Sequence, residues 1–222
     1  MRFKVDLKIF LFFILFYFTK QIETYVMILI FAMIHELGHL LVGIILGMRP
    51  NKIELTPFGF SISFKIVPKD YNVKILEGNR MQIKEIIIAL AGPLTNFIIL
   101  YIVTKLKINL FSKLMIIYSN ILLIIFNLLP MYPLDGGRIL KAVLHILFGR
   151  RKAEKYINNI SFVVLLILTA IASVGIFYAK NISIFIIIIF LWCLYIQEDV
   201  VYRRRNKIYE LIRKTLEIEK NK

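Results

Sequence analysis

Two histidines and a glutamate lie inside a long apolar stretch of this 222-residue chain. The stretch runs from Met27 to Leu46 and contains His35-Glu36-Leu37-Gly38-His39. Residues four apart lie on the same face of a helix, so both imidazoles can bind one metal ion. The glutamate that follows the first histidine can then take the proton of an attacking water. This HExxH pattern predicts a hydrolytic zinc site.

The cost of placing such groups in an apolar segment supports that interpretation. A charged residue at the centre of a spanning helix costs about 3 kcal/mol on insertion scales, so it persists where a function or a partner offsets the cost. The chain has three histidines, and two of them belong to this motif. The alternative is a buried His–Glu–His cluster that is satisfied by hydrogen bonds alone.

A catalytic zinc site needs three protein ligands and one open position, so a third ligand must come from elsewhere. Asp135 is the preferred candidate because it lies in Asn127–Gly137, a segment with two prolines and two glycines. Irregular backbone at membrane depth is tolerated only where it is buried in protein or lines a wet cavity. The alternative is a helix that ends at the membrane surface with Asp135 as its cap. Glu54 and His145 are weaker candidates, in a loop and beside a basic segment.

The composition indicates an all-α polytopic membrane protein. Hydrophobic residues make up 59% of the chain, against about 45–50% in soluble domains, and the lone Cys193 excludes a disulfide scaffold. We expect one transmembrane domain over residues 1–200 and a basic cytoplasmic tail over 201–222. About six spans are predicted, of which the first is short and either crosses or lies at the interface: Lys8–Phe18, Tyr25–Leu46, Ile86–Thr104, Leu114–Leu129, Ile160–Phe177 and Ile182–Ile196.

The distribution of basic residues predicts the orientation in the cell membrane. Of the 29 Lys and Arg residues, 24 lie in the N-terminus, residues 49–84, residues 138–155 and the C-terminal tail. By the positive-inside rule, both termini and the opening of the site are therefore cytoplasmic. The net charge of +15 is interpreted as attraction to anionic lipid and not to nucleic acid.

One long segment after the HExxH helix is not helical in pattern. Apolar and polar residues alternate over Lys52–Thr56 and again over Phe60–Lys65, on either side of Pro57, Phe58 and Gly59. Alternation of this kind around a Pro/Gly turn predicts a short β-hairpin, or re-entrant segment, after the zinc helix. Its strands could pair with an unwound substrate segment.

Taken together, these motifs resemble the site-2 protease family of intramembrane zinc metalloproteases. The resemblance lies in the HExxH motif, in Asn127–Gly137 and in Ala91–Asn96, which is similar to the family's GPxxN element. The Pro-Phe-Gly segment and the six-span layout resemble the subgroup of stage IV sporulation protein FB, whose members cleave a membrane-tethered sigma-factor precursor. The 222 residues contain neither that subgroup's CBS domain nor a PDZ domain, so the resemblance covers the zinc chemistry and not substrate recognition or regulation.

The expected activity is hydrolysis of a peptide bond in or near the transmembrane segment of a membrane-tethered protein. One Zn²⁺ per chain is held by His35, His39 and Asp135, with Glu36 as general base and then acid. A sigma-factor precursor or similar regulator is the implied substrate, and membrane-protein inhibitors are further partners.

Six residues are expected to contact the substrate. The amides of Asn96 and Asn127 can bond an exposed backbone, although a helix cap or an interhelical bond is the alternative for each. The others are Gly92, which alternatively breaks or kinks its helix together with Pro93, and the segment Pro57, Phe58 and Gly59.

A membrane zinc transporter or metal sensor is the competing function. It requires further carboxylates or histidines along a path through the spans. Apart from Glu36, the sequence offers only Glu85 and Glu198, both near span ends.

Overall fold

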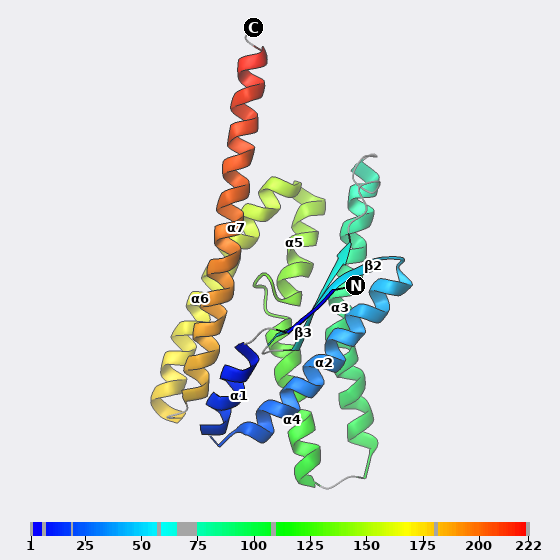
Figure 1. Ribbon diagram of the computed structural model, residues 1–222, viewed down its shortest axis with the longest axis vertical. Helices are drawn as coiled ribbons and strands as arrows, with labels where there is room; N and C mark the ends of the chain where they lie inside the picture. The colour runs from blue at the N-terminus through cyan, green and yellow to red at the C-terminus, as the bar shows by residue number, and fades with distance from the viewer. Residues whose placement is uncertain are drawn as a thin grey trace.

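The computed structural model describes residues 2–5, 8–18, 20–56, 59–65, 75–107, 110–179 and 182–220. Pro57 and Phe58, two of the expected substrate contacts, lie outside the described residues. The described chain is a bundle of helices with a small sheet on one side (Figure 1). Its helices are α1 (Lys8–Phe18), α2 (Ile22–Ile45), α3 (Ile75–Lys105), α4 (Leu110–Asn127), α5 (Asp135–Phe148), α6 (Arg150–Ala179) and α7 (Ile182–Lys220).

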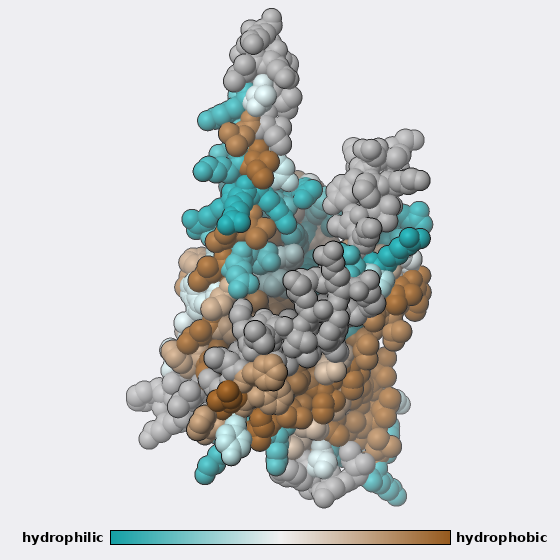
Figure 2. All heavy atoms as spheres, in the orientation of Figure 1, coloured by the Kyte–Doolittle hydropathy of each residue, from teal (hydrophilic) through white to brown (hydrophobic). Residues whose placement is uncertain are grey.

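Four of these helices are long and apolar enough to cross a membrane. They are α2, and the segments Asn79–Lys105 of α3, Arg150–Gly175 of α6 and Ile184–Leu211 of α7. The fourth predicted span corresponds to α4, in which Ser112–Asn127 is a shorter apolar helix. The first corresponds to α1, whose 11 residues reach about 16 Å, roughly half the hydrocarbon thickness. In Figure 2 hydrophobic residues cover α2, and hydrophilic residues gather on the projecting part of α7.

Three helices depart from the sequence analysis. The third helix is not broken at Gly92 and Pro93 but runs through both from Ile75 to Lys105. Residues 138–155, counted among the basic segments outside the spans, are mostly helical, because α5 is a 14-residue helix from Asp135 to Phe148 and α6 begins at Arg150. The helix that contains the last predicted span continues without a break into the basic tail, because nothing between Ile182 and Lys220 is a glycine or proline that would stop a helix.

The sheet has three strands in the order β1-β2-β3. β1 (Arg2–Val5), which the sequence analysis missed, pairs in parallel with β2 (Arg49–Thr56), and β2 pairs antiparallel with β3 (Gly59–Lys65). The ring of Phe64 on β3 lies against Gly43 on α2, where the missing side chain leaves room for it. The sheet is thereby fixed to the helix that carries the HExxH motif.

α5 lies between two longer helices, with α3 on one side and α6 on the other. The apolar core on the α6 side is formed by Met131, Leu165 and Leu191, which come from the segment before α5, from α6 and from α7. Met131 and Leu165 are fully buried. This core fixes the segment that leads into α5.

We expect Leu165→Ala to destabilise the bundle more than Leu166→Ala. Leu165 is fully buried, whereas its neighbour is 46% exposed on the outer face of α6. Loss of the buried contacts is expected to cost about 2 kcal/mol, the low end for Leu→Ala, because transfer of apolar surface to lipid contributes little. Thermal unfolding of both variants in the same detergent measures the difference, and equal midpoints would contradict the packing described above.

Candidate metal centre

Three metal-binding side chains meet inside the bundle, far from one another in sequence. His35 and His39 are one turn apart on α2, and Asp135 is the first residue of α5. The two imidazoles are 2% exposed and the aspartate is 5% exposed. Within the described residues, this is the group of His, Cys, Asp and Glu side chains whose ligand atoms come close enough to hold a metal ion.

The donor atoms form a nearly equilateral triangle. Oδ2 of Asp135 is 3.0 Å from Nε2 of His35 and 3.1 Å from Nε2 of His39, and the two nitrogens are 3.2 Å apart. Tetrahedral zinc with bonds of about 2.1 Å separates its ligand atoms by roughly 3.4 Å. The triangle is therefore close to the spacing that Zn²⁺ requires, and two nitrogens with one carboxylate oxygen are donors that Zn²⁺ accepts.

The tautomer of His39 provides a second test of the fit. Its Nδ1–H donates to the backbone carbonyl of Ile88 on α3 at 2.7 Å. In the neutral ring Nε2 then carries a lone pair, and this lone pair faces the carboxylate oxygen of Asp135. Two facing acceptors repel each other unless a proton or a cation lies between them. The site therefore has the polarity of a cation site.

Asp135 is held in place by the irregular segment 128–134. Short backbone bonds close its turns, from Met131 N to Leu129 O at 2.7 Å and from Leu134 N to Met131 O at 2.9 Å. Gly136 and Gly137 follow, and a Cβ at either position would collide with the backbone of this segment. The paired glycines therefore allow the first turn of α5 to pack on the segment that precedes it.

The two imidazoles approach the backbone of α3 so closely at position 92 that only a glycine fits there. A Cβ built there would lie 2.5 Å from Nε2 of His35 and would also overlap the ring of His39. Any side chain at position 92 would occupy the space of the imidazoles. The structure therefore supports a packing role for this glycine beside the metal centre, whereas the substrate contact expected for it stays a prediction.

Glu36 follows His35 on α2 and is partly buried. It is within electrostatic range of His39, Asp135 and Arg138. It does not belong to the group of three ligands. A carboxylate beside the donors but not among them is available for proton transfer.

The expected substrate-binding amides are placed differently. Asn96 on α3 is fully buried, one turn beyond Gly92, and neither atom of its amide has a partner among the described residues. Asn127 is the last residue of α4 and is partly buried. Gly59 begins β3. His145 on α5 lies outside the group of three ligands found among the described residues. Glu54 is in β2, and its side chain is outside the part of the chain that the structure describes.

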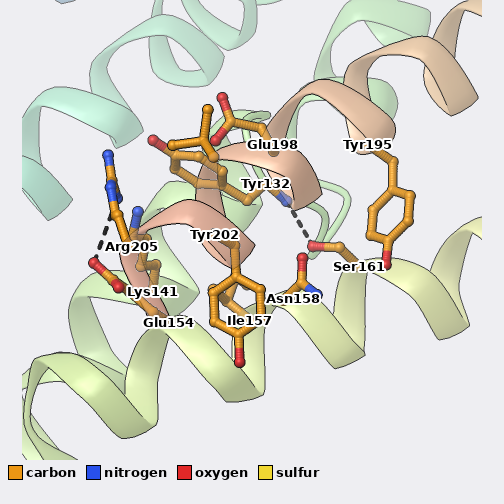
Figure 3. A pocket seen from close by; sticks show the side chains of 11 residues that line it. Tyr132, Lys141, Glu154, Ile157, Asn158, Ser161, Tyr195, Glu198, Tyr202 and Arg205 are labelled. Atoms are coloured by element: carbon orange, nitrogen blue, oxygen red, sulfur yellow. Dashed lines mark hydrogen bonds and ion pairs between the residues drawn. The ribbon is translucent and has the colours of Figure 1, made fainter. Parts of the chain in front are cut away.

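The sequence analysis did not predict a cavity of about 30 Å³ that lies between α5, α6 and α7. Several charged residues line it, and none of the three metal ligands does. Figure 3 shows that charged side chains surround it, among them Lys141, Glu154 and Arg205. Burial, and then the charge of Arg205, lowers the pKa of Lys141. At its edge the backbone N–H of Tyr132 donates to Oγ of Ser161 at 3.0 Å, which fastens the segment before Asp135 to α6 (Figure 3).

Long apolar helices that enclose a His-His-Asp donor set define a multi-pass membrane protein with a metal centre inside its bundle. A family model agrees with that class: the model of peptidase family M50 matches residues 23–112 and 101–171, more than half of the chain. The chain belongs to this family of site-2 proteases, which confirms the resemblance seen in the motifs. Zn²⁺ is the cofactor that membership implies for the three ligands.

The chain is also similar to individual proteins. The zinc metalloprotease MJ0392 of Methanocaldococcus jannaschii is 32% identical over 161 residues, 68% of this chain and 44% of that protein. Stage IV sporulation protein FB of Bacillus subtilis is 27% identical over 126 residues, 55% of this chain and 40% of that protein. The matches thus span less than half the length of these curated relatives. The solved structure of the site-2 protease from Methanocaldococcus jannaschii superposes with a TM-score of 0.63 and 25% identity, over 89% of this chain and 91% of that chain.

We expect Gly92→Ala to weaken zinc binding at least tenfold, because the added methyl group would occupy space that both imidazoles fill. The control is Gly175→Ala on α6, where a Cβ would make an ordinary contact of 3.7 Å with Ile184. Zinc content after dialysis against a chelator, measured by elemental analysis of the purified chains, compares the two. Full zinc content in Gly92→Ala would contradict the geometry of the site.

Proposed function

We propose that this chain is an intramembrane zinc metalloprotease that hydrolyses a peptide bond in or near the transmembrane segment of a membrane-tethered protein. The observation that carries the proposal is the buried triangle of Nε2, Nε2 and Oδ2 atoms 3.0–3.2 Å apart, with a carboxylate next to it in sequence. Membership of peptidase family M50 supports the same chemistry.

The chain's own residues would act as follows. His35, His39 and Asp135 would hold Zn²⁺. When bound, the ion lowers the pKa of a coordinated water and polarises the scissile carbonyl. Glu36 accepts a proton from the attacking water at its carboxylate and then donates that proton to the leaving amine. The hydrogen bond from His39 to Ile88 keeps its other nitrogen free for the metal.

Because Glu36 and Asp135 have different proposed roles, their variants are expected to differ in zinc binding. Glu36→Gln is expected to retain zinc but lose cleavage by at least 100-fold, because the amide cannot accept the proton. Asp135→Ala is expected to lose both zinc and cleavage. Co-expression with candidate tethered substrates, followed by blotting and zinc analysis, measures both effects.

The control is Glu23→Gln in the first turn of the same helix, where the carboxylate is exposed and should be dispensable. Cleavage by Glu36→Gln at the wild-type rate would remove the proposed role of that residue. A full complement of zinc in Asp135→Ala would remove the aspartate from the ligand set.

The sheet suggests how the substrate is presented. A helical segment has no free backbone groups, so it must unwind before hydrolysis. β3 is the last strand of the sheet, and it is held against the zinc helix through Phe64 and Gly43. We infer that the unwound segment adds to the outer edge of β3 as a further strand. The side-chain amides of Asn96 and Asn127 would then hydrogen-bond the exposed backbone of this segment. The other residues expected to contact it are Pro57, Phe58, Gly59 and Gly92.

Proline scanning of β3 tests the added strand. Successive backbone N–H groups of a strand point to opposite edges, so of Ile62→Pro and Ser63→Pro, one removes a donor that faces β2 and the other a donor that faces outward. We expect the outward-facing proline to reduce cleavage at least tenfold while thermal stability and zinc content stay near wild type. Normal cleavage by both variants would contradict strand addition.

The substrate class is inferred from similarity. One relative is a sporulation protein, and this supports a membrane-tethered regulator such as a sigma-factor precursor as the substrate. The zinc site itself discriminates little between such substrates, because it acts on a peptide bond. Membrane-protein inhibitors and anionic lipid are further proposed partners, and the basic residues Arg203, Arg204 and Arg205 support the latter.

We further propose about six spans, of which the first is the short α1, which either crosses the bilayer or lies at its interface. The C-terminus and the opening of the site are then cytoplasmic, and the N-terminus is cytoplasmic where α1 crosses. α4, with 18 residues or about 27 Å, supports a fifth span. The ends of α3, α6 and α7 that are rich in basic residues lie toward the same end of the bundle in Figure 1, which agrees with the positive-inside rule.

The competing transporter or sensor has less support. A transport path needs successive sites across the bilayer. The part of the chain that the structure describes contains one group of side chains that could hold a metal. A hydrolase needs no more than that one group.

A further inference from the structure

We propose that Arg138, held by Glu85, is a positioning residue that orients Asp135 toward the metal. The inference rests on the metal centre of the proposed function. Neither Arg138 nor Glu85 lies within the HExxH motif or within Asn127–Gly137.

The two oxygens of Asp135 have different partners. Oδ2 faces the two imidazoles, whereas Oδ1 accepts a hydrogen bond from Nη1 of Arg138 at 3.3 Å, one turn further along α5. A carboxylate on a short side chain can rotate and exchange its oxygens. A guanidinium fixed to Oδ1 prevents that rotation and keeps Oδ2 directed at the metal.

The guanidinium is itself fixed by a second helix. Its Nε and Nη2 donate to Oε1 of Glu85 on α3 at 3.0 and 2.9 Å. The planar fork of an arginine allows these two nitrogens to bond one carboxylate while Nη1 reaches another. Arg138 is 22% exposed and Glu85 is 37% exposed, so the pair is partly shielded from water.

The charge balance at the metal centre also requires the carboxylate of Glu85. A guanidinium this close to a divalent cation repels it, and the repulsion is strong where water is scarce. The carboxylate of Glu85 offsets that positive charge. Arg138 can thus stabilise the negative ligand Asp135 while the summed charge of the Arg138–Glu85 pair at the metal stays near zero.

These contacts form a pattern on α3. Glu85, Ile88 and Gly92 are three and four residues apart, so they lie on one face of the helix. The first holds Asp135 through Arg138, the second holds His39 through its backbone carbonyl, and the third leaves room for both imidazoles. One face of α3 therefore supports all three metal ligands without contributing a ligand of its own.

Metal affinity tests the inference directly, without a protease assay. The full chain is purified in detergent and stripped of metal, and zinc affinity is measured by competition with a chromophoric chelator. Arg138→Gln is expected to bind zinc 10–100-fold more weakly than wild type, the usual effect of removing such an outer contact. Glu85→Gln is expected to weaken binding about tenfold, and the double variant no more than Arg138→Gln alone, because the glutamate acts through the arginine.

The absorption spectrum of the Co²⁺-loaded chain reports the ligand geometry and should change in both single variants. The control is Arg203→Gln, which breaks an ion pair of 2.7 Å with Asp199 on α7 and should leave zinc affinity unchanged. If Arg138→Gln does not fold, Glu85→Gln carries the test, because its side chain is more exposed.

Wild-type affinity and an unchanged Co²⁺ spectrum in either single variant would overturn this inference and leave the proposed function intact. A wild-type chain that binds no zinc would overturn both.

Discussion

The structure depends on one electrostatic constraint: ionisable groups inside an apolar bundle must satisfy one another. His35, His39 and Asp135 do so by converging on a common point, with less than one-tenth of each residue exposed. One oxygen of the Asp135 carboxylate faces the two imidazoles, and the other accepts a hydrogen bond from Arg138. A divalent cation completes the arrangement, because without one the acceptor atoms face one another.

The two halves of the centre come from different kinds of backbone. α2 is regular, and the spacing of four residues alone places two rings on one face. Asp135 follows an irregular segment, which packs against α6 through Met131 and is hydrogen-bonded to Ser161. α3 and α6 thus act as the two supports between which α5 is positioned.

Much of this could be predicted from sequence. The HExxH spacing fixes the two histidines, and the Pro-Gly pattern of Asn127–Gly137 indicates the broken backbone that carries the third ligand. The outer residues could not be predicted in the same way. Glu85 is 53 residues from Arg138, and its position near a span end indicated only proximity to a membrane surface. Their pairing depends on how α3 packs on α5, which no local pattern records. The strand β1 was missed for a similar reason, because its partner β2 lies about 50 residues away.

The 39 residues of α7 form a continuous helix of about 58 Å, nearly twice the thickness of the hydrocarbon layer. Its inner half packs on α6, and its outer half projects beyond the bundle (Figure 1). No glycine or proline lies between the two halves, so the sequence offers neither of the residues that commonly kink a helix. A partner that displaced the projecting half of α7 would therefore also displace the half that packs on α6. The segment that precedes Asp135 is hydrogen-bonded to α6 through Ser161, so such a displacement would reach the segment that carries the third metal ligand.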